Sequence, residues 1–224
     1  MIEIKNLSKS YKVGGNVINA VDKVNLSVAR REIISILGHS GSGKTTLLSL
    51  IGGLTTPSAG TVTIDNVDLW SISDDELSRL RNRKINFIFQ FSSLVPTLNV
   101  IENVLLPTVF SKDGTDKRPL AGQLLDTLGI SDKASMYPSE LSGGQQRRVA
   151  IARAFINDPE IILADEPTGD LDEETEADVL ALFRTMNAEK GITFLIVTHS
   201  SEIARQGHKL YVMNHGVLSQ KDIA

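Results

Sequence analysis

A glycine-rich stretch early in the chain has the residue types that bind phosphate. It reads GHSGSGKTT, from Gly38 to Thr46, so four residues separate two glycines and a Lys-Thr pair follows. Glycines let successive backbone N–H groups converge on phosphate oxygens, which side chains would obstruct. Lys44 suits β- and γ-phosphate charge, and the Thr45 hydroxyl suits Mg²⁺. A buried-strand pattern before the loop and a helical pattern after it favour a nucleotide site over an ordinary glycine-rich turn. The predicted phosphate contacts are Gly38, His39, Ser40, Gly41, Ser42, Gly43, Lys44, Thr45 and Thr46.

An acidic pair follows a buried-strand pattern in the second half of the chain. Asp165 and Glu166 end the apolar run that begins at Ile161. Ligands of parallel sheets gather at the carboxyl ends of the strands, so both carboxylates are expected to face the phosphates. Asp165 would hold Mg²⁺ through water, and Glu166 would orient or deprotonate the attacking water. Such a pair taken alone is more often a helix N-cap, but the phosphate loop favours the catalytic interpretation.

Three further residues are candidates whose type leaves alternatives open. His199 ends the apolar run ITFLIVTH, where a contact with the γ-phosphate is expected. Gln90 ends INFIFQ and either touches Mg²⁺ or the attacking water, or is an ordinary strand-end amide. Tyr11 lies in a predicted glycine-flanked loop, where its ring either stacks on adenine or is simply exposed. The side chains of the other histidines are interpreted as structural: His39, His208 and His215.

A second anion-binding pattern lies far from the first. The stretch LSGGQQRRVAIARA, from Leu141 to Ala154, has a polar cap, two glycines and then a helical pattern. A helix N-terminus of this kind favours an anion, because its free N–H groups and its dipole both point there. Nothing in the neighbouring sequence resembles a second nucleotide pocket. The stretch therefore predicts half of a site whose other half lies elsewhere.

The predicted elements form an α/β fold. Continuous apolar runs, typical of strands buried on both faces, alternate with helical patterns, which implies a parallel sheet with right-handed crossovers. Ile2 and Ile4 alternate with polar residues, and a strand around Val21 to Val28 is expected to pair nearby. The residues from 91 to 140 contain no convincing strand and hold a capping box at Asn99, so they predict an inserted helical lobe. The chain is thus expected to be a single domain over residues 1–224. Its predicted parts are an α/β ATPase core over 1–90 and 157–224, with an N-terminal antiparallel β subdomain, and a helical lobe over 91–156.

Composition excludes several classes of protein. The 224 residues contain 23 Lys and Arg against 27 Asp and Glu, for a net charge of -4, which argues against a large basic nucleic-acid surface. The chain has no cysteine, so neither disulfides nor thiolate metal sites are possible. No apolar run reaches the roughly 18 residues that a membrane span needs, and the N-terminus lacks the apolar core of a signal peptide. We expect a cytosolic protein, without membrane insertion or nucleic-acid binding, whose link to a membrane runs through a partner.

These motifs, in this order, resemble the nucleotide-binding subunit of an ATP-binding-cassette transporter, with a P-loop NTPase core. LSGGQ at Leu141 to Gln145 is similar to the family's signature sequence, and TGDLD at Thr168 to Asp172 is similar to its D-loop. Gln90, Glu166 and His199 resemble the Q-loop, catalytic glutamate and H-loop residues, and Tyr11 the adenine-stacking residue. The resemblance implies ATP and Mg²⁺ as cofactors and a second copy of the chain as partner. Each γ-phosphate would be held by Lys44 of one copy and by the signature of the other. The signature residues are Ser142, Gly143, Gly144 and Gln145.

Within the family the chain resembles the lipoprotein-release, macrolide-export and cell-division group. The segments that carry this likeness are Pro96 to Pro107, Tyr137 to Ala154 and Ala164 to Asp172. The likeness implies a separate FtsX-like permease, whose cytoplasmic helix would enter a groove beside Gln90 and the apolar segment from Val95 to Leu106. The alternative for that segment is packing within the lobe's own core. An importer ATPase, for example for polar amino acids, is the alternative function.

The chain departs from the family pattern at three positions. His39 replaces the proline usual in the phosphate loop, Thr45 replaces the commoner serine, and Arg147 replaces a frequent glutamine. Thr45 keeps the hydroxyl that Mg²⁺ needs, and the change at His39 keeps the backbone donors. None of the three indicates an inactive enzyme.

Overall fold

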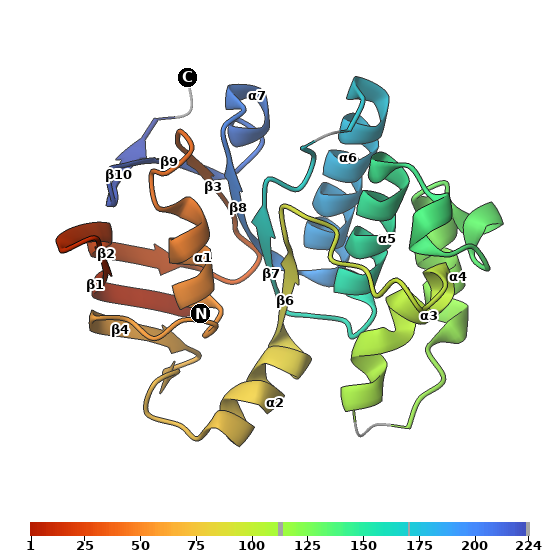
Figure 1. Cartoon of the computed structure of the whole chain (residues 1–224), viewed down its shortest axis with the longest axis horizontal. Coiled ribbons are helices and arrows are strands. Elements are labelled where there is room, and N and C mark those ends of the chain that lie inside the picture. Colours follow the sequence, from red (N-terminus) through yellow and green to blue (C-terminus); the bar gives the residue numbers. More distant parts are fainter. Residues whose placement is uncertain (112–113, 170, 223–224) are drawn as a thin grey trace.

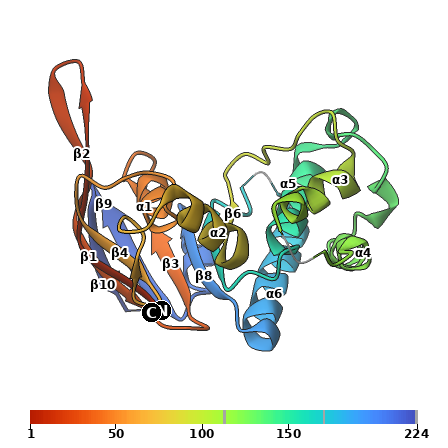
Figure 2. The same ribbon diagram turned by 90° about the horizontal axis from the view of Figure 1, so that it is seen from below.

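The computed structural model describes residues 1–111, 114–169 and 171–222 and contains two β-sheets and a helical lobe (Figure 1). The smaller sheet is antiparallel, with strand order β2-β1-β4-β5. Ile2 of β1 pairs with Val28 of β2 on one side and with Ile64 of β4 on the other. The predicted N-terminal antiparallel subdomain is confirmed. Figure 2 shows that the β1–β2 hairpin projects beyond the rest of this sheet. Its strands are β1 (Ile2–Val13), β2 (Asn16–Val28), β4 (Ala59–Ile64) and β5 (Val67–Asp68).

The larger sheet positions the site. Its order is β10-β9-β3-β8-β7-β6, and every neighbouring pair is parallel except the β9–β10 hairpin. The carboxyl ends of the five parallel strands therefore meet at one edge, as the alternation of strands and helices predicts. The strands are β3 (Ile33–Leu37), β6 (Ile85–Ile88), β7 (Ile161–Asp165), β8 (Thr193–Thr198), β9 (Lys209–Asn214) and β10 (Val217–Lys221).

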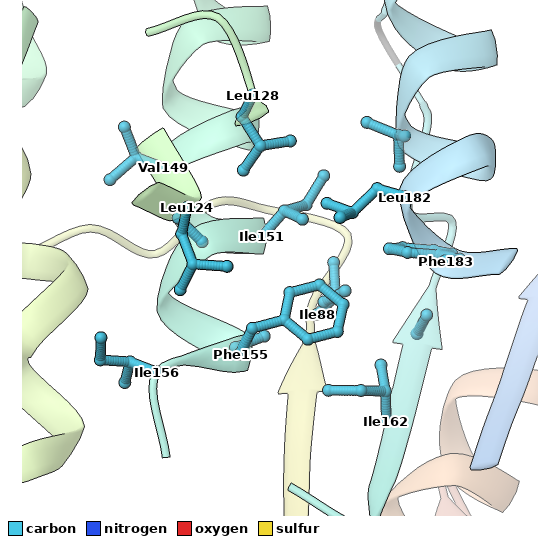
Figure 3. Packing of buried hydrophobic residues seen from close by; sticks show 14 of the residues in the cluster. Ile88, Leu124, Leu128, Val149, Ile151, Phe155, Ile156, Ile162, Leu182 and Phe183 are labelled. Carbon is cyan, nitrogen blue, oxygen red and sulfur yellow. The ribbon is translucent and has the colours of Figure 1, made fainter. Parts of the chain in front are cut away.

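Both faces of this sheet are covered by hydrophobic clusters. In β8, Leu195 and Val197 belong to one cluster, whereas Phe194 and Ile196 belong to the other, because successive side chains of a strand point to opposite faces. The first cluster packs against α1 (Lys44–Ile51) and the antiparallel sheet. The second joins the sheet to the helical lobe, where side chains of β6, β7 and three helices meet (Figure 3). Continuous apolar runs are thus explained by burial on both faces.

Helices form the lobe and the crossovers. Ser73 and Asn99 cap α2 and α3 through complete capping boxes, as their spacing to Glu76 and Glu102 predicts. Between residues 91 and 140 the described part of the chain contains helices and no strand, so the helical character of this stretch is confirmed. The α-helices after α1 are α2 (Asp74–Lys84), α3 (Val100–Leu105), α4 (Arg118–Thr127), α5 (Gly143–Phe155), α6 (Glu173–Lys190) and α7 (Ser201–Ala204). Short 3₁₀ helices lie at η1 (Leu106–Phe110), η2 (Ser131–Lys133) and η3 (Pro138–Glu140).

Some local predictions are wrong. Tyr11 lies within strand β1, paired with Ile18 of β2, and not in a loop; the glycines that suggested a loop form the hairpin turn three residues later. Strand β6 ends at Ile88, so Gln90 lies two residues beyond it. In the described ranges, no helix is long and apolar enough to cross a membrane.

Candidate active site

A cleft of about 850 Å³ opens at the carboxyl edge of the parallel sheet. It collects the ends of β3, β7 and β8, together with the loop after β6, as expected for an open α/β sheet. Most of the predicted site residues line it: His39, Ser40, Gly41, Ser42, Gly43, Lys44, Thr45, Thr46, Gln90, Asp165, Glu166 and His199. The remaining lining residues are Ala20, Thr168, Gly169, Glu176, Thr198, Ser200 and Ile203.

The phosphate loop is folded as a concave backbone turn whose shape requires glycine. Gly43 has a φ of 105°, and a Cβ there would lie 2.0 Å from the Ala20 carbonyl oxygen. An L-residue is therefore excluded both by conformation and by the close approach of β2. Neighbouring strands fix the ends of the loop. The Gly38 N–H donates to the Thr198 carbonyl (3.1 Å), and the Gly216 N–H of the β9–β10 turn donates to the Ser42 carbonyl (3.0 Å).

Lys44 is held over this loop at the start of α1. Its side chain is buried, and its Nζ donates to the carbonyls of Gly38 (2.6 Å) and His39 (3.1 Å). The same Nζ lies 3.8 Å from Glu166 Oε1. An ammonium fixed between the loop and a carboxylate is placed to bind an anion that enters the cleft. Gly38, predicted as a contact, supports Lys44 and is not among the residues lining the cleft.

Asp165 is the last residue of β7 and Glu166 follows it, and their two carboxyl groups have different environments. Burial raises the pKa of Asp165, and the Glu166 charge acts in the same direction, while a hydrogen bond with Thr45 opposes both. Glu166 has a φ of 47°, a left-handed conformation that costs a non-glycine residue on the order of 1–2 kcal/mol. Its N–H donates to the Val197 carbonyl at 2.9 Å. This kink turns the Glu166 side chain into the cleft beside Lys44.

His199 holds the Glu166 carboxylate. The His199 N–H donates to Glu166 Oε2 at 3.2 Å, and His199 Nδ1 lies 3.0 Å from the same oxygen. One oxygen of Glu166 thus faces the histidine and the other faces Lys44. The side chain of Glu166 is only 13% exposed, whereas that of His199 is 70% exposed. The arrangement presents a fixed carboxylate at the mouth of the phosphate loop.

Two buried hydroxyls in the cleft have no hydrogen-bond partner within the described part of the chain. They are Ser42 Oγ and Thr168 Oγ1, and both residues line the cleft. Buried polar groups are nearly always hydrogen-bonded, so the pair fits a ligand rich in acceptor oxygens, as a nucleotide is. Thr168 was noted in the sequence only through its likeness to the D-loop. Ser200, which also lines the cleft, was not predicted, although the strand-end position that identified His199 would have identified it too.

The signature residues lie outside this cleft. Ser142 caps α5 through a capping box: its Oγ accepts from the Gln145 N–H (3.3 Å) and Gln145 Oε1 accepts from the Ser142 N–H (2.9 Å). Ser142 and Gly143 are exposed, and the cleft lining includes none of the residues 142–145. Tyr11 also lies outside the lining. Asp170 of the predicted D-loop lies outside the described residues.

The chain is similar to known proteins in sequence. Residues 21–169 match the ABC transporter family model. An ABC transporter ATP-binding protein of Methanocaldococcus jannaschii, MJ0796, is 43% identical over 99% of this chain and 97% of its own length. The lipoprotein-releasing system ATP-binding protein LolD of Idiomarina loihiensis is 38% identical, over 99% of this chain and 97% of its own length.

Two further matches concern a longer protein and a solved structure. The macrolide export ATP-binding/permease protein MacB of Rhodopirellula baltica is 39% identical over 98% of this chain, which spans only 33% of that longer protein. The dimeric post-hydrolysis structure of MJ0796 with ADP and Pi superposes with a TM-score of 0.95 at 40% identity, covering 100% of this chain and 99% of that one. The family match, the phosphate loop and the fixed carboxylate agree with one another. The chain therefore belongs to the ABC transporter family, as an ATP-binding and ATP-hydrolysing subunit.

Proposed function

We propose that two copies of this chain enclose two ATP molecules between them and thereby drive a membrane permease in export or lipoprotein release. The observation that carries the proposal is the α5 N-terminus. It has the chemistry of an anion site, is exposed, and lies outside the chain's own cleft. The dimer recorded for MJ0796, with ADP and Pi, supports a second copy as the source of the missing ligand.

Within each ATP site the residues take distinct roles. The loop from Gly38 to Thr46 and Lys44 bind the phosphates, and Glu166 accepts a proton from the attacking water. His199 orients Glu166 through the hydrogen bonds described above. Gln90, which lines the cleft from the loop after β6, contacts the water or the metal ion. Tyr11 is proposed to stack on adenine from the β1–β2 hairpin.

The donor set also fits Mg²⁺. Asp165 and Thr45 are hydrogen-bonded to each other, and Gln90 lines the same cleft. Mg²⁺ typically takes one or two carboxylates and completes its coordination with phosphate oxygens and water. Thr45, Gln90 and Asp165 would hold the ion, which would neutralise phosphate charge.

The signature of one copy completes the site of the other. Ser142 and Gly144 would add donors to the γ-phosphate held by Lys44 of the partner copy. Charge spreads over the γ-phosphoryl oxygens during transfer, so such donors stabilise the transition state by roughly 3–4 kcal/mol each. Hydrolysis then depends on dimerisation. For this role we assign residues 1–224 to one cassette domain, with 91–156 as the signature lobe.

We propose a permease surface that differs from the segment suggested by the sequence. Val100 and Val104 are fully buried in the lobe cluster, and Ile101 and Leu105 pack against it, so the alternative of core packing holds for them. The exposed apolar side chains lie at the two ends of the stretch from 89 to 110. They are Phe89, Phe91, Val109 and Phe110. We propose that this exposed set contacts an FtsX-like permease, which keeps the chain peripheral on the cytoplasmic face of the membrane.

The named relatives favour export or release over import. LolD belongs by name to a lipoprotein-releasing system, and MacB to macrolide export. The importer alternative gains no support from these names. The cargo would be chosen by the permease.

A single-cysteine crosslink tests the permease surface, because the chain has no cysteine of its own. Phe91→Cys, at a side chain 77% exposed, is expected to crosslink to a co-expressed FtsX-like permease. Val217→Cys on β10, also exposed, is the matched control and should give little product. Equal crosslinking from both positions, or none from Phe91→Cys, would place the permease elsewhere.

A further inference from the structure

A buried guanidinium lies between the signature helix and two of the loops that line the cleft, those after β6 and β7. Arg147, in the second turn of α5, is 3% exposed. Its Nη1 donates to the carbonyls of Phe89 and Gln90, the latter at 2.7 Å. Its Nε donates to the Pro167 carbonyl at 3.0 Å, and its Nη2 donates to the Glu166 carbonyl. One side chain thus fixes four backbone carbonyls from two loops.

Two of these carbonyls belong to residues that line the cleft, Gln90 and Glu166. The other two belong to Phe89 and Pro167, which directly precede lining residues. Gln90 and Glu166 contribute side chains to the cleft, and the same two residues accept hydrogen bonds from Arg147 through their main chains. Glu166 has a left-handed backbone, which persists only where the surroundings hold it. The Val197 carbonyl holds its N–H, and Arg147 holds its C=O. Arg147 therefore stabilises the kink that aims the carboxylate.

The fork geometry of arginine matters here. A planar guanidinium presents donors in several fixed directions, whereas lysine offers a single compact ammonium. A second arginine of α5, Arg153, continues the same contact by donating to the carbonyls of Ser92 (2.7 Å) and Ser93 (2.9 Å). The loop after β6 is thus attached to α5 at two points along the helix. Of these two arginines, Arg147 is the one that also donates to carbonyls of the loop after β7.

We propose that Arg147 is a positioning residue that links the signature helix to the catalytic carboxylate of its own copy. The proposal rests on the proposed function, in which Ser142 touches the partner's ATP and Glu166 activates water. Arg147 lies five positions after Ser142, the N-cap of the same helix, so a shift of the α5 N-terminus moves the guanidinium as well. When Ser142 contacts the partner's nucleotide, the shift would then reach Gln90 and Glu166 of the copy that contains Ser142.

Three variants test the link. Arg147→Met removes the fork, Arg147→Lys keeps the charge, and Arg148→Met removes the next guanidinium, whose Nη1 donates to the Leu128 carbonyl inside the lobe. We expect Arg147→Met to lower kcat by about 10- to 100-fold, the cost of a misplaced catalytic group, while ATP affinity stays within about twofold. Arg147→Lys should recover part of this loss. Arg148→Met should keep the wild-type kcat.

Hydrogen exchange supplies a readout that needs no turnover. Backbone amides of residues 87–93 and 164–169 should exchange faster in Arg147→Met than in Arg148→Met. If Arg147→Met does not fold, Arg147→Lys, which loses the fork but keeps the charge, is compared with Arg148→Lys in the same exchange measurement. Equal kcat for the Arg147 and Arg148 variants, a parallel loss of ATP affinity, or unchanged exchange in either loop would overturn the proposal. A wild type that hydrolyses ATP as a monomer would instead refute the proposed dimer, and the exchange data would still decide the role of Arg147.

Discussion

Glu166→Gln is expected to bind ATP, to lose turnover and to accumulate as an ATP-bound dimer. Its kcat should fall by about 10²- to 10⁴-fold, the usual contribution of a positioned general base. Binding should persist because glutamine has the same shape and can still accept from the His199 N–H. The substitution also removes a negative charge 3.8 Å from Lys44 Nζ, next to the phosphate loop, so ATP affinity should not fall. Phosphate release and gel filtration with ATP measure the two effects.

Glu174→Gln is the matched control for this variant. Glu174 is an exposed carboxylate in the first turn of α6, outside the residues that line the cleft. The same substitution there should leave kcat unchanged and cost at most about 1 kcal/mol of helix-dipole stabilisation. Wild-type hydrolysis by Glu166→Gln would move the general base to another residue. A Glu166→Gln protein that stays monomeric with saturating ATP would contradict the shared site.

Gly143→Asp is expected to stop hydrolysis without harming the isolated chain. A Cβ at Gly143 would meet nothing within 4 Å, so the monomer has room for the side chain. Aspartate in the first turn of a helix is also favourable, because it complements the positive end of the dipole and replaces a flexible glycine. Across the interface, the same carboxylate would repel the partner's phosphates and obstruct the signature donors. Specific ATPase activity should fall by about 10²- to 10³-fold, the value of an oxyanion-type donor.

The melting temperature of the Gly143→Asp monomer should equal or exceed that of the wild type, and its ATP affinity should match the wild-type value. Gly122→Asp is the control: Gly122 lies in α4 of the same lobe, and a Cβ there also meets nothing within 4 Å. That variant should hydrolyse ATP normally. Full activity of Gly143→Asp would show that the α5 N-terminus does not face a nucleotide. Loss of ATP binding by the monomer would place the signature in the chain's own site.

The sequence predicts features that are set by neighbouring residues. The phosphate loop depends on glycines within six positions, and the capping boxes of α2 and α3 depend on residues three apart. Strand β8 was recognisable because both of its faces are buried, which makes the run continuously apolar. The position of His199 followed from the strand alone. Its contact with Glu166 joins residues 33 positions apart, and sequence position suggested only that both reach the same edge.

Other features depend on long-range packing and left no local pattern. Arg147 looked like a substitution within a helix, yet it donates to carbonyls 57 and 19 residues away. The burial of Val100 and Val104 depends on the helices that pack against α3. Tyr11 was misplaced because the β1–β2 hairpin continues past several register shifts, which a short alternating pattern does not reveal.

The dependence of specific ATPase rate on protein concentration tests the shared site most directly. In the proposed dimer each complete site takes Lys44 and Glu166 from one copy and Ser142 from the other, so a monomer is not expected to assemble one. With saturating ATP and sedimentation measured in parallel, the rate per chain should rise with concentration while monomer predominates, and level off once dimer predominates. A rate per chain that stays constant while the protein sediments as a monomer would contradict the account.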